Sequence, residues 1–565
     1  MPEPASLRDP ARETVRRAGT AVERAARALL DLRRPDGGWS GVVSAAAVAT
    51  GAAVIALHRA DPAGNADLVG RACGWLRRVQ DSSGGWGEDV GAPATLTATG
   101  IAIAGLAVAE PGASAGHIER GLARIDAMGG MAALSDRSRC ALSAVVRQFL
   151  AYGGLYDQRL LPRVPVELAL LPRSLRSKLS FTVPGAMSWG VMHAYRPRKR
   201  SPVRTLVDRL AVPKALGYLA ELQDFGGESG GYEESPLLTA CVCVGLDEAG
   251  VRPDIVGKGL RYLRETIRAD GSWSVNRDLE ISVGSYVVAG LADAGCDDLE
   301  RTLLWLRGAQ RFEPFFATGA PPGGWGWACP SGWPNSGDTA SVLLALAGFD
   351  LPPTDPSVAA GVSWLLGTQN RDGSWGCFCR NSSRTLDGPC AVMTADTITA
   401  LHRTGKLPPE HPAIRRALAW FRRARHPDGA LDCRWYTGLT AGTACTLRAL
   451  GEIGHGTSDV AVACREWLVT QQGTDGGWGG GDGEPSTVEE TAWAVLGLLD
   501  GASGGYRTRE AIDRGIGYLL DRQRADGLWD PAVLGVYFFD VRYASDHHAN
   551  GHALQALARY RATRC

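Results

Sequence analysis

The chain has 565 residues, enough for two to four domains and a large buried core. Its 60 Lys and Arg residues are balanced by 60 Asp and Glu residues. This balance argues against nucleic acid as the main partner, because nucleic-acid-binding proteins usually carry a basic excess.

The beginning of the chain contains no export signal that the pattern can identify. Residues 1–18 are polar and charged, without an apolar signal-peptide core. The 13 Cys residues form no C-x-x-C pair, so we expect reduced thiols in a cytoplasmic protein. Two uncharged stretches, 41–57 and 90–109, consist mostly of small residues. They are too weakly apolar for membrane spans and are predicted to be buried helices.

The strongest signal is a repeat of about fifty residues, in which Gln is followed by Gly at +4 and Trp at +6. This repeat accounts for the many Trp and Gly residues, 17 and 72. The clean copies are Gln80/Gly84/Trp86, Gln369/Gly373/Trp375, Gln472/Gly476/Trp478 and Gln523/Gly527/Trp529, and copies that keep the Gly and Trp are Gly37/Trp39, Gly271/Trp273 and Gly323/Trp325.

Each clean copy follows a helical pattern and precedes a second apolar helix, so the unit is predicted to be a helical hairpin. The Gly supplies left-handed backbone at the end of the first helix. The Trp is predicted to stack on the Gln amide and pin the turn to the neighbouring repeat. Such hairpins cannot bury their apolar faces alone. The sequence therefore predicts an all-α protein of two α-α barrels, essentially without sheet.

These repeats match the Gln-Trp motif of the squalene–hopene cyclase and class II terpene cyclase family, which the chain resembles over nearly its whole length. The resemblance implies that residues 1–34 and 266–565 form the catalytic-type barrel. Residues 35–265 would form a barrel inserted after the initial helix. Further similar segments are Trp333-Pro334, Asp338-Thr339-Ala340, Cys433-Arg434-Trp435-Tyr436 and Leu557-Ala558-Arg559-Tyr560.

The resemblance implies an enzyme, a terpene- or triterpene-type cyclase that converts a linear polyprenyl substrate or its epoxide to a cyclic product through carbocations. It implies no cofactor and no metal. In the family, the middle Asp of an Asp-x-Asp-Asp run protonates an alkene or epoxide. The matching run is Asn335-Ser336-Gly337-Asp338, so this chain is an atypical member without the middle acid. The family's His near the acid is matched by Ala400.

The initiating acid is therefore predicted to be a non-standard one. The first candidate is Asp338, helped by Asp396 or by the segment 546–548 with His548. Both aspartates also fit the pattern of helix N-caps, which is a purely structural alternative.

Aromatic residues are predicted to line the cavity, because an aromatic face stabilises a cation by about 0.5–2 kcal/mol. By resemblance, the inward-pointing residues that contact the substrate are Trp327, Trp333, Phe378, Trp435, Tyr537 and Phe539.

Other functions stay open. The same cavity would suit an allylic diphosphate, but the acidic cluster that a bound metal needs is poor, with Asp482, Glu484, Glu489 and Glu490. A non-catalytic isoprenoid-binding protein would show the same fold signals. A zinc site is a weak alternative, because C-x-C spacing with distant partners is weak evidence. Its ligands would be Cys377, Cys379, Cys390, Cys433 and His426.

A water-insoluble substrate has to leave a bilayer to reach the cavity, so we expect peripheral membrane contact through residues 160–195. The basic run 196–200 follows a largely apolar stretch, which permits contact with anionic lipid. Nothing in the pattern indicates an oligomeric state.

Overall fold

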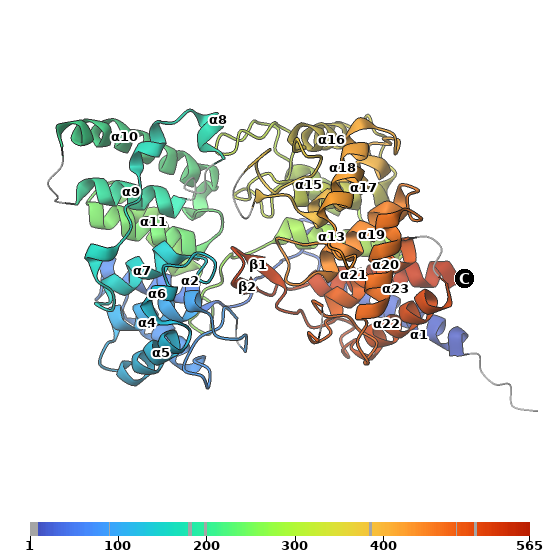
Figure 1. Cartoon of the computed structure of the whole chain (residues 1–565), viewed down its shortest axis with the longest axis horizontal. Coiled ribbons are helices and arrows are strands. Elements are labelled where there is room, and N and C mark those ends of the chain that lie inside the picture. Colours follow the sequence, from blue (N-terminus) through green and yellow to red (C-terminus); the bar gives the residue numbers. More distant parts are fainter. Residues whose placement is uncertain are drawn as a thin grey trace, which may run out of the picture.

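The computed structural model describes residues 10–89, 91–178, 184–196, 201–382, 387–481, 483–501 and 505–564. In these ranges helices are joined by turns, and the one sheet is an antiparallel pair, β1 (Gly535–Tyr537) and β2 (Val541–Tyr543). Figure 1 shows two groups of helices side by side, with the strand pair between them. The predicted all-α fold of two α-α barrels is confirmed.

In the described ranges, six helices form the inner ring of the C-terminal barrel. Each packs against the next and the last packs against the first, so the ring is closed. In ring order they are α13 (Glu280–Asp293), α15 (Ser336–Leu346), α17 (Ala391–Arg403), α19 (Thr440–Glu452), α21 (Val488–Asp500) and α23 (His548–Arg564). Outside them lie α14 (Glu300–Gly308), α16 (Pro356–Thr368), α18 (Pro412–Ala424), α20 (Asp459–Gln471), α22 (Tyr506–Asp521) and α1 (Pro10–Asp31).

Inner and outer helices differ in composition because they face different surroundings. The inner helices are buried on nearly every side, and small residues let them approach closely. A Cβ at Gly551 of α23 would lie 2.7 Å from the backbone of Tyr286 in α13, so this crossing requires glycine. An outer helix such as α18 instead buries one apolar face at helical spacing and exposes its arginines.

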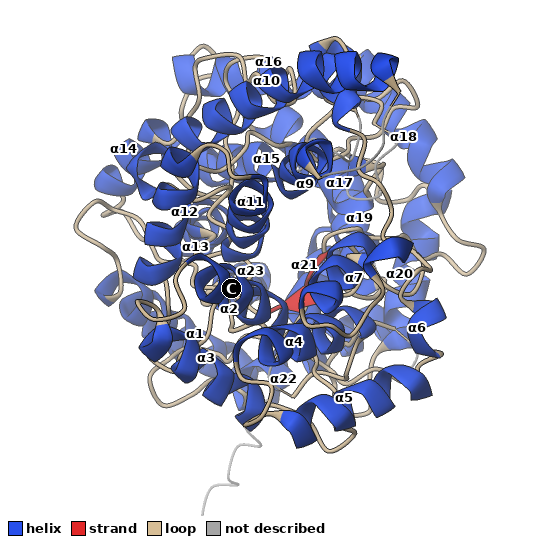
Figure 2. Ribbon diagram, turned by 90° about the vertical axis from the view of Figure 1, so that its left-hand side faces the viewer, coloured by secondary structure: helices blue, strands red, loops and turns tan. Residues whose placement is uncertain are grey.

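The N-terminal barrel repeats this plan with a less regular outer layer. Its inner helices are α2 (Ala47–Ala60), α4 (Leu96–Ala109), α7 (Ser143–Tyr152), α9 (Pro184–Tyr195) and α11 (Pro236–Ala249). Around them lie α3 (Ala66–Arg78), α5 (Ala115–Ala127), α6 (Gly130–Ala133), α8 (Arg173–Arg176), α10 (Pro202–Phe225) and α12 (Pro253–Glu265). Short 3-10 helices are η1 (Gln158–Leu160), η2 (Val166–Leu170), η4 (Gly227–Ser229) and, in the other barrel, η5 (Ala347–Phe349). Figure 2 looks along the line that joins the barrels and shows their helices arranged around it.

The turn of each repeat is held by two side chains. The Trp375 indole N–H donates to the carbonyl of Leu365, ten residues earlier, at 2.7 Å, and most other repeat tryptophans make the same bond. The Gln369 amide donates to the carbonyl of Gly373 and to that of Ala413, at the start of the next outer helix. Gln thus supplies the hydrogen bonds to the neighbouring repeat, and the Trp ring packs against that repeat as predicted, because a Cβ at Gly515 of the next outer helix would lie 2.7 Å from the Trp478 ring.

The last repeat closes the outer ring onto the beginning of the chain. The Gln523 amide donates to the carbonyls of Gly527 and of Ala21 in α1, each at 2.9 Å. Helix α1 packs against α22 and α23, and Figure 1 shows it among the helices of the C-terminal barrel. The domain limits at residues 34 and 265 stay a prediction.

The strand pair, which sequence did not indicate, links the two barrels. Its turn residue Asp540 accepts a hydrogen bond from the Thr97 hydroxyl of α4 at 2.6 Å and one from the Ala141 N–H at 3.3 Å. The two uncharged stretches near the N-terminus fold largely as the buried inner helices α2 and α4, as predicted. Among the described helices, none combines the length and apolar character that a bilayer crossing requires.

We expect Gln523→Ala to weaken the C-terminal barrel, because two carbonyls lose their donor. The free energy of unfolding should fall by about 2–4 kcal/mol, measured by urea denaturation. Gln158, which is exposed in η1, supplies the matched control: Gln158→Ala should change it by less than about 0.5 kcal/mol. Equal effects of the two substitutions would contradict the ring-closing role.

Candidate active site

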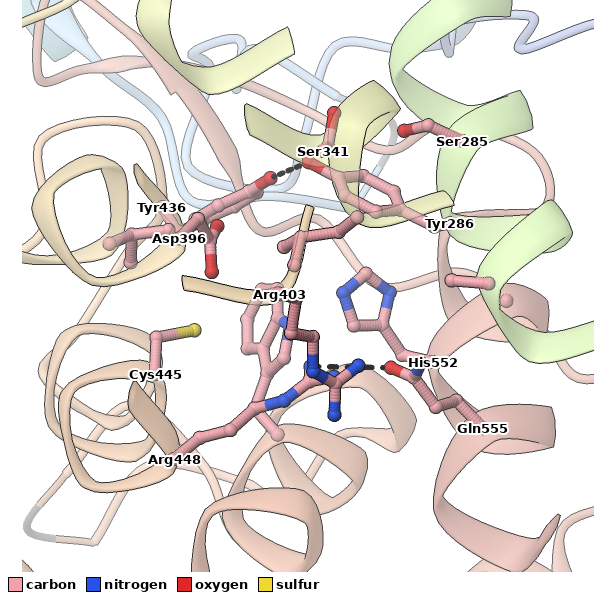
Figure 3. Close-up of a pocket in the computed structure, with 15 residues that line it drawn as sticks. Ser285, Tyr286, Ser341, Asp396, Arg403, Tyr436, Cys445, Arg448, His552 and Gln555 are labelled. Carbon is pink, nitrogen blue, oxygen red and sulfur yellow. Dashed lines mark hydrogen bonds between the residues drawn. The ribbon is translucent and has the colours of Figure 1, made fainter. Parts of the chain in front are cut away.

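An internal cavity of about 50 Å³ lies inside the C-terminal ring (Figure 3), and every inner helix of that barrel contributes to its lining. The side chains that dominate it are Tyr286, Asp396, Arg448, Trp493 and His552. A second hollow of about 480 Å³ lies at the C-terminal ends of the inner helices. Both are lined by Leu344 and Gln555, among others, so the two spaces are neighbours.

Asp396 opens directly into this cavity. Its helix α17 begins at Ala391, so Asp396 lies within the helix and the N-cap alternative is wrong. No described residue makes a hydrogen bond with its carboxyl group. Burial raises its pKa to about 6, and the Arg448 guanidinium opposes that rise. Figure 3 shows the carboxyl facing the same space as Arg448 and Cys445.

Arg448 belongs to a charged network that closes the floor of the cavity. It donates to the Gln555 side chain at 3.3 Å and pairs with Asp500 at 3.2 Å. Arg559 and Arg403 pair with acidic groups in the same layer. The network lies where the inner helices end, and cations are favoured there because helix C-termini carry partial negative charge. Its charges are balanced among Arg403, Arg448, Arg559, Asp293, Glu452 and Asp500.

Asp338, the first candidate from sequence, does not line this cavity but lies one helical turn before the lining residue Ser341, and both of its carboxylate oxygens are hydrogen-bonded. The N-cap of α15 is Asn335, so the N-cap alternative for Asp338 is also wrong. One carboxylate oxygen accepts from the Ser282 hydroxyl at 2.5 Å, and the other accepts from the Asn335 amide. Burial raises the pKa of Asp338 to about 6, and these two donors oppose the rise.

The two positions that the resemblance matched to an acid and a His, Gly337 and Ala400, carry no polar side chain. Gly337 lies in the first turn of α15, and a Cβ built on it would meet Asn335 and Met393 at 3.4 Å, which is an ordinary contact. Ala400 is fully buried in α17.

Five of the predicted aromatic residues form a continuous series. Ring centroids lie 6.0 Å apart for Trp327 and Phe378, 5.8 Å for Trp333 and Phe378, 6.1 Å for Phe378 and Trp435, and 5.8 Å for Trp435 and Tyr537. All five lie on segments that precede an inner helix. Phe539 does not join them, because its side chain is 44% exposed at the turn between β1 and β2.

A second aromatic group surrounds the cavity itself, and sequence reasoning had named only His548 of it as a candidate. Tyr286, Tyr436 and Trp493 pack with His548 and His552 at centroid distances of 4.5–5.5 Å. Tyr286 and Trp493 are the aromatic residues of helices whose other members are small, aliphatic or, near the helix ends, acidic. That contrast is the signal that could have identified them.

His548 lies at the start of α23, with its Nε2 3.3 Å from the Tyr436 hydroxyl. Burial holds its pKa well below the usual range. Asp546, in the same predicted segment, is exposed and does not line the cavity. The structure thus brings Asp396, His548 and His552 together with Tyr286, Tyr436 and Trp493, and leaves Asp338 outside the cavity lining.

The predicted metal-binding alternatives find no support in the described residues, where no three His, Cys, Asp or Glu side chains converge on a metal position. Glu489 and Glu490 are buried in α21, where burial raises their pKa values to about 7 and about 8. Asp482 lies outside the described residues. The Cys390 and Cys433 sulfurs lie 3.9 Å apart, whereas the Cys379 thiol donates to the Ser177 carbonyl and His426 pairs with Asp432.

The chain is similar to known proteins in sequence and in fold. The model of the squalene-hopene cyclase C-terminal domain matches residues 317–562, and that of the N-terminal domain matches residues 22–190. A probable squalene–hopene cyclase from Sinorhizobium fredii is 25% identical, with 96% of each chain covered. The squalene–hopene cyclase of Zymomonas mobilis is 26% identical over 96% of this chain and 95% of its own. The solved ent-copalyl diphosphate synthase from Streptomyces platensis has a TM-score of 0.62 at 20% identity, covering 96% of this chain and 99% of its own, a likeness in fold alone.

Proposed function

The chain belongs to the squalene–hopene cyclase family and is an enzyme of the terpene cyclase class, and from that premise we propose that Asp396 starts the cyclisation. The substrate is a linear polyprenyl chain or its epoxide, and the product is a ring system formed through carbocations. The observation that carries the proposal is the Asp396 carboxyl, unpaired among the described residues and open to an aromatic cavity.

Asp396 satisfies the two conditions that an initiating acid must meet. It must hold a proton in the resting enzyme, and a pKa of about 6 leaves about a tenth of it protonated at pH 7. It must also release the proton to a very weak base. Arg448 supports that step, because its charge stabilises the carboxylate left behind. Arg448 is itself held by Asp500 and Gln555, so its charge is positioned before the reaction begins.

Asp338 takes a positioning role in this proposal, although sequence alone favoured it as the acid. Both of its oxygens already accept hydrogen bonds, from Ser282 and Asn335. Burial still raises its pKa to about 6, so what separates it from Asp396 is that neither of its oxygens is left unbonded. Asp338 thereby ties α13 to the start of α15, and Ser282 lies one turn before the cavity residues Ser285 and Tyr286.

The reaction also requires that its carbocations be stabilised, and the aromatic residues would provide this. Tyr286, Tyr436 and Trp493 line the cavity that Asp396 faces, where the first cation would form, and each face would contribute about 0.5–2 kcal/mol. The series from Trp327 to Tyr537 would contact the remainder of the chain. The cavity, at about 50 Å³, is smaller than a polyprenyl chain, so substrate binding requires these rings to move apart.

The same observations give less support to the two alternative functions, an enzyme acting on an allylic diphosphate and a non-catalytic binding protein. An allylic diphosphate needs a metal site, and the described residues gather none. A non-catalytic binder gains nothing from an unpaired buried carboxyl, which costs stability without a partner. Failure of the native protein to convert any polyprene would favour the binder.

We expect Asp396→Asn to reduce product formation by about 10²–10⁴-fold, the usual worth of a general acid. Asn has nearly the same shape, so folding should be unaffected. The measurement is product formation from C15 to C30 polyprenes and their epoxides, analysed by gas chromatography and mass spectrometry. Asp338→Asn is the matched control and should lose less than about tenfold. If Asp338→Asn is the inactive variant, Asp338 is the acid and the proposal is wrong.

A carboxyl restored at Gly337 should add an acid where the family carries one. The Cβ fits without displacement, because its nearest neighbours lie at 3.4 Å. We expect Gly337→Asp to raise turnover of a plain polyene by about tenfold or more, and to restore activity to Asp396→Asn. Gly337→Asn is the control of equal size. Equal rates for the Asp and Asn variants would show that the vacant position is not within reach of the substrate.

We further propose that the N-terminal barrel rests on a lipid surface through α10 and the adjoining segment. Val203, Leu206 and Leu210 are 71%, 56% and 56% exposed and lie on one face of α10. Leu175 of α8, within the predicted contact segment 160–195, is exposed as well. Most of the basic run, residues 197–200, lies outside the described residues. An apolar stripe of this kind is typical of contact with a membrane interface.

Replacing Leu206 and Leu210 together by Ser should lower binding to anionic lipid vesicles by about tenfold or more, because burial of each Leu is worth about 1.5–3 kcal/mol. Sedimentation with the vesicles measures the bound fraction. Leu304 of the other barrel is 62% exposed and gives the control Leu304→Ser, which should bind as the native protein does. Unchanged binding of the double variant would rule out α10 as the contact.

A further inference from the structure

The cavity holds a second reactive group besides Asp396, the His552 side chain of α23. Figure 3 shows the His552 ring and Asp396 on opposite sides of the same space. His552 is 8% exposed, and its Nδ1 lies 3.1 Å from the backbone carbonyl oxygen of His548. Sequence reasoning did not consider this residue.

The contact with the His548 carbonyl determines which nitrogen carries the proton. A carbonyl oxygen only accepts hydrogen bonds, so Nδ1 of His552 must be the donor. In a neutral imidazole the other nitrogen, Nε2, then has a lone pair. No described residue makes a hydrogen bond to that atom. Burial and the charge of Arg448 lower the pKa of His552 to about 4, so the ring is neutral near pH 7.

The surroundings of His552 are those of a cation site. Its ring lies 4.5 Å from that of Tyr286 and 5.3 Å from that of Trp493, measured between centroids. A cation held against these faces would lie beside the free lone pair. His548 is a poorer candidate for a base, because its Nε2 is already within hydrogen-bond reach of the Tyr436 hydroxyl.

We propose that His552 is the base that ends the reaction. Its Nε2 takes a proton from a carbon next to the last cationic centre. The C–H bond breaks, its electrons form a carbon–carbon double bond, and an N–H bond forms on the imidazole. The proton that Asp396 supplied at the start is thereby balanced, so the product is an alkene isomeric with the substrate. This inference rests on the proposed cyclase function, and it excludes an alcohol as the main native product.

The charges around the site favour resetting of the enzyme after each turnover. The imidazolium formed on His552 faces Arg448, whose charge disfavours it, while the Asp396 carboxylate on the opposite side is the base that must be reprotonated. Return of the proton from His552 to Asp396, directly or through water, restores both groups to their starting forms.

The test compares the products of the native enzyme with those of His552→Phe, which keeps an aromatic ring and removes the lone pair. We expect the ratio of the native alkene to alcohols and other alkenes to fall by about tenfold, while substrate consumption persists because Asp396 is intact. His552→Gln is the second variant, in case Phe disturbs packing. The control is His426→Gln, at a partly exposed position outside the cavity, and its product ratio should equal the native one.

Nitrogen chemical shifts of ¹⁵N-histidine-labelled protein give a readout that does not depend on turnover. We expect a neutral His552 with the proton on Nδ1 from pH 8 down to about pH 5. A protonated ring at neutral pH, or a proton on Nε2, would overturn the inference. So would an unchanged product ratio in both His552 variants, with the proposed function intact. A native enzyme that converts no polyprene would instead overturn the proposed function, and this role with it.

Discussion

The hydrogen bond from each repeat glutamine to the start of the next outer helix is the interaction on which the rest of the structure depends. The inner helices are buried on nearly all sides, so they have no polar face that would orient them toward solvent. Their positions must come from the turns that hold them. Gln369 and Gln472 tie neighbouring hairpins together, and Gln523 ties the last hairpin to α1. A closed ring follows, and with it a space that water does not fill freely.

A charged group inside such a space costs free energy because it loses its contact with water. This cost explains the chemistry that we assign to the space. At the floor of the cavity, where the inner helices end, arginines and carboxylates pair with one another in a charge-balanced network. Asp338 accepts hydrogen bonds from Ser282 and Asn335, which oppose the rise in its pKa that burial causes. Asp396 and His552 differ, because each presents an unbonded atom to an aromatic wall. Desolvation raises the pKa of the first and lowers that of the second, which leaves an acid and a base facing the same substrate.

Much of the fold and part of the site could be predicted from the sequence. The spacing of Gln, Gly and Trp predicted the hairpins, because each residue has a separate geometric task in the turn. The series from Trp327 to Tyr537 and the vacancy at Gly337 followed from resemblance, and the catalytic roles of Asp396 and His548 stay predictions. Tyr286, Trp493 and His552 were missed, because helices buried all round have no periodicity that indicates which side faces the cavity. Side-chain partners also decide function: sequence does not show that Asp338 is bonded and Asp396 is not.

The central claim is that a proton from Asp396 starts the reaction, and isotope incorporation tests it most directly. The enzyme is incubated in D₂O with unlabelled polyprenes or their epoxides, and the products are analysed by mass spectrometry and NMR. Protonation of an alkene predicts one carbon-bound deuterium in each product molecule, at the carbon where cyclisation begins, and its loss together with the product in Asp396→Asn. Cyclised product without carbon-bound deuterium from a polyprene that carries no epoxide, or deuterated product from Asp396→Asn at the native rate, would contradict the account.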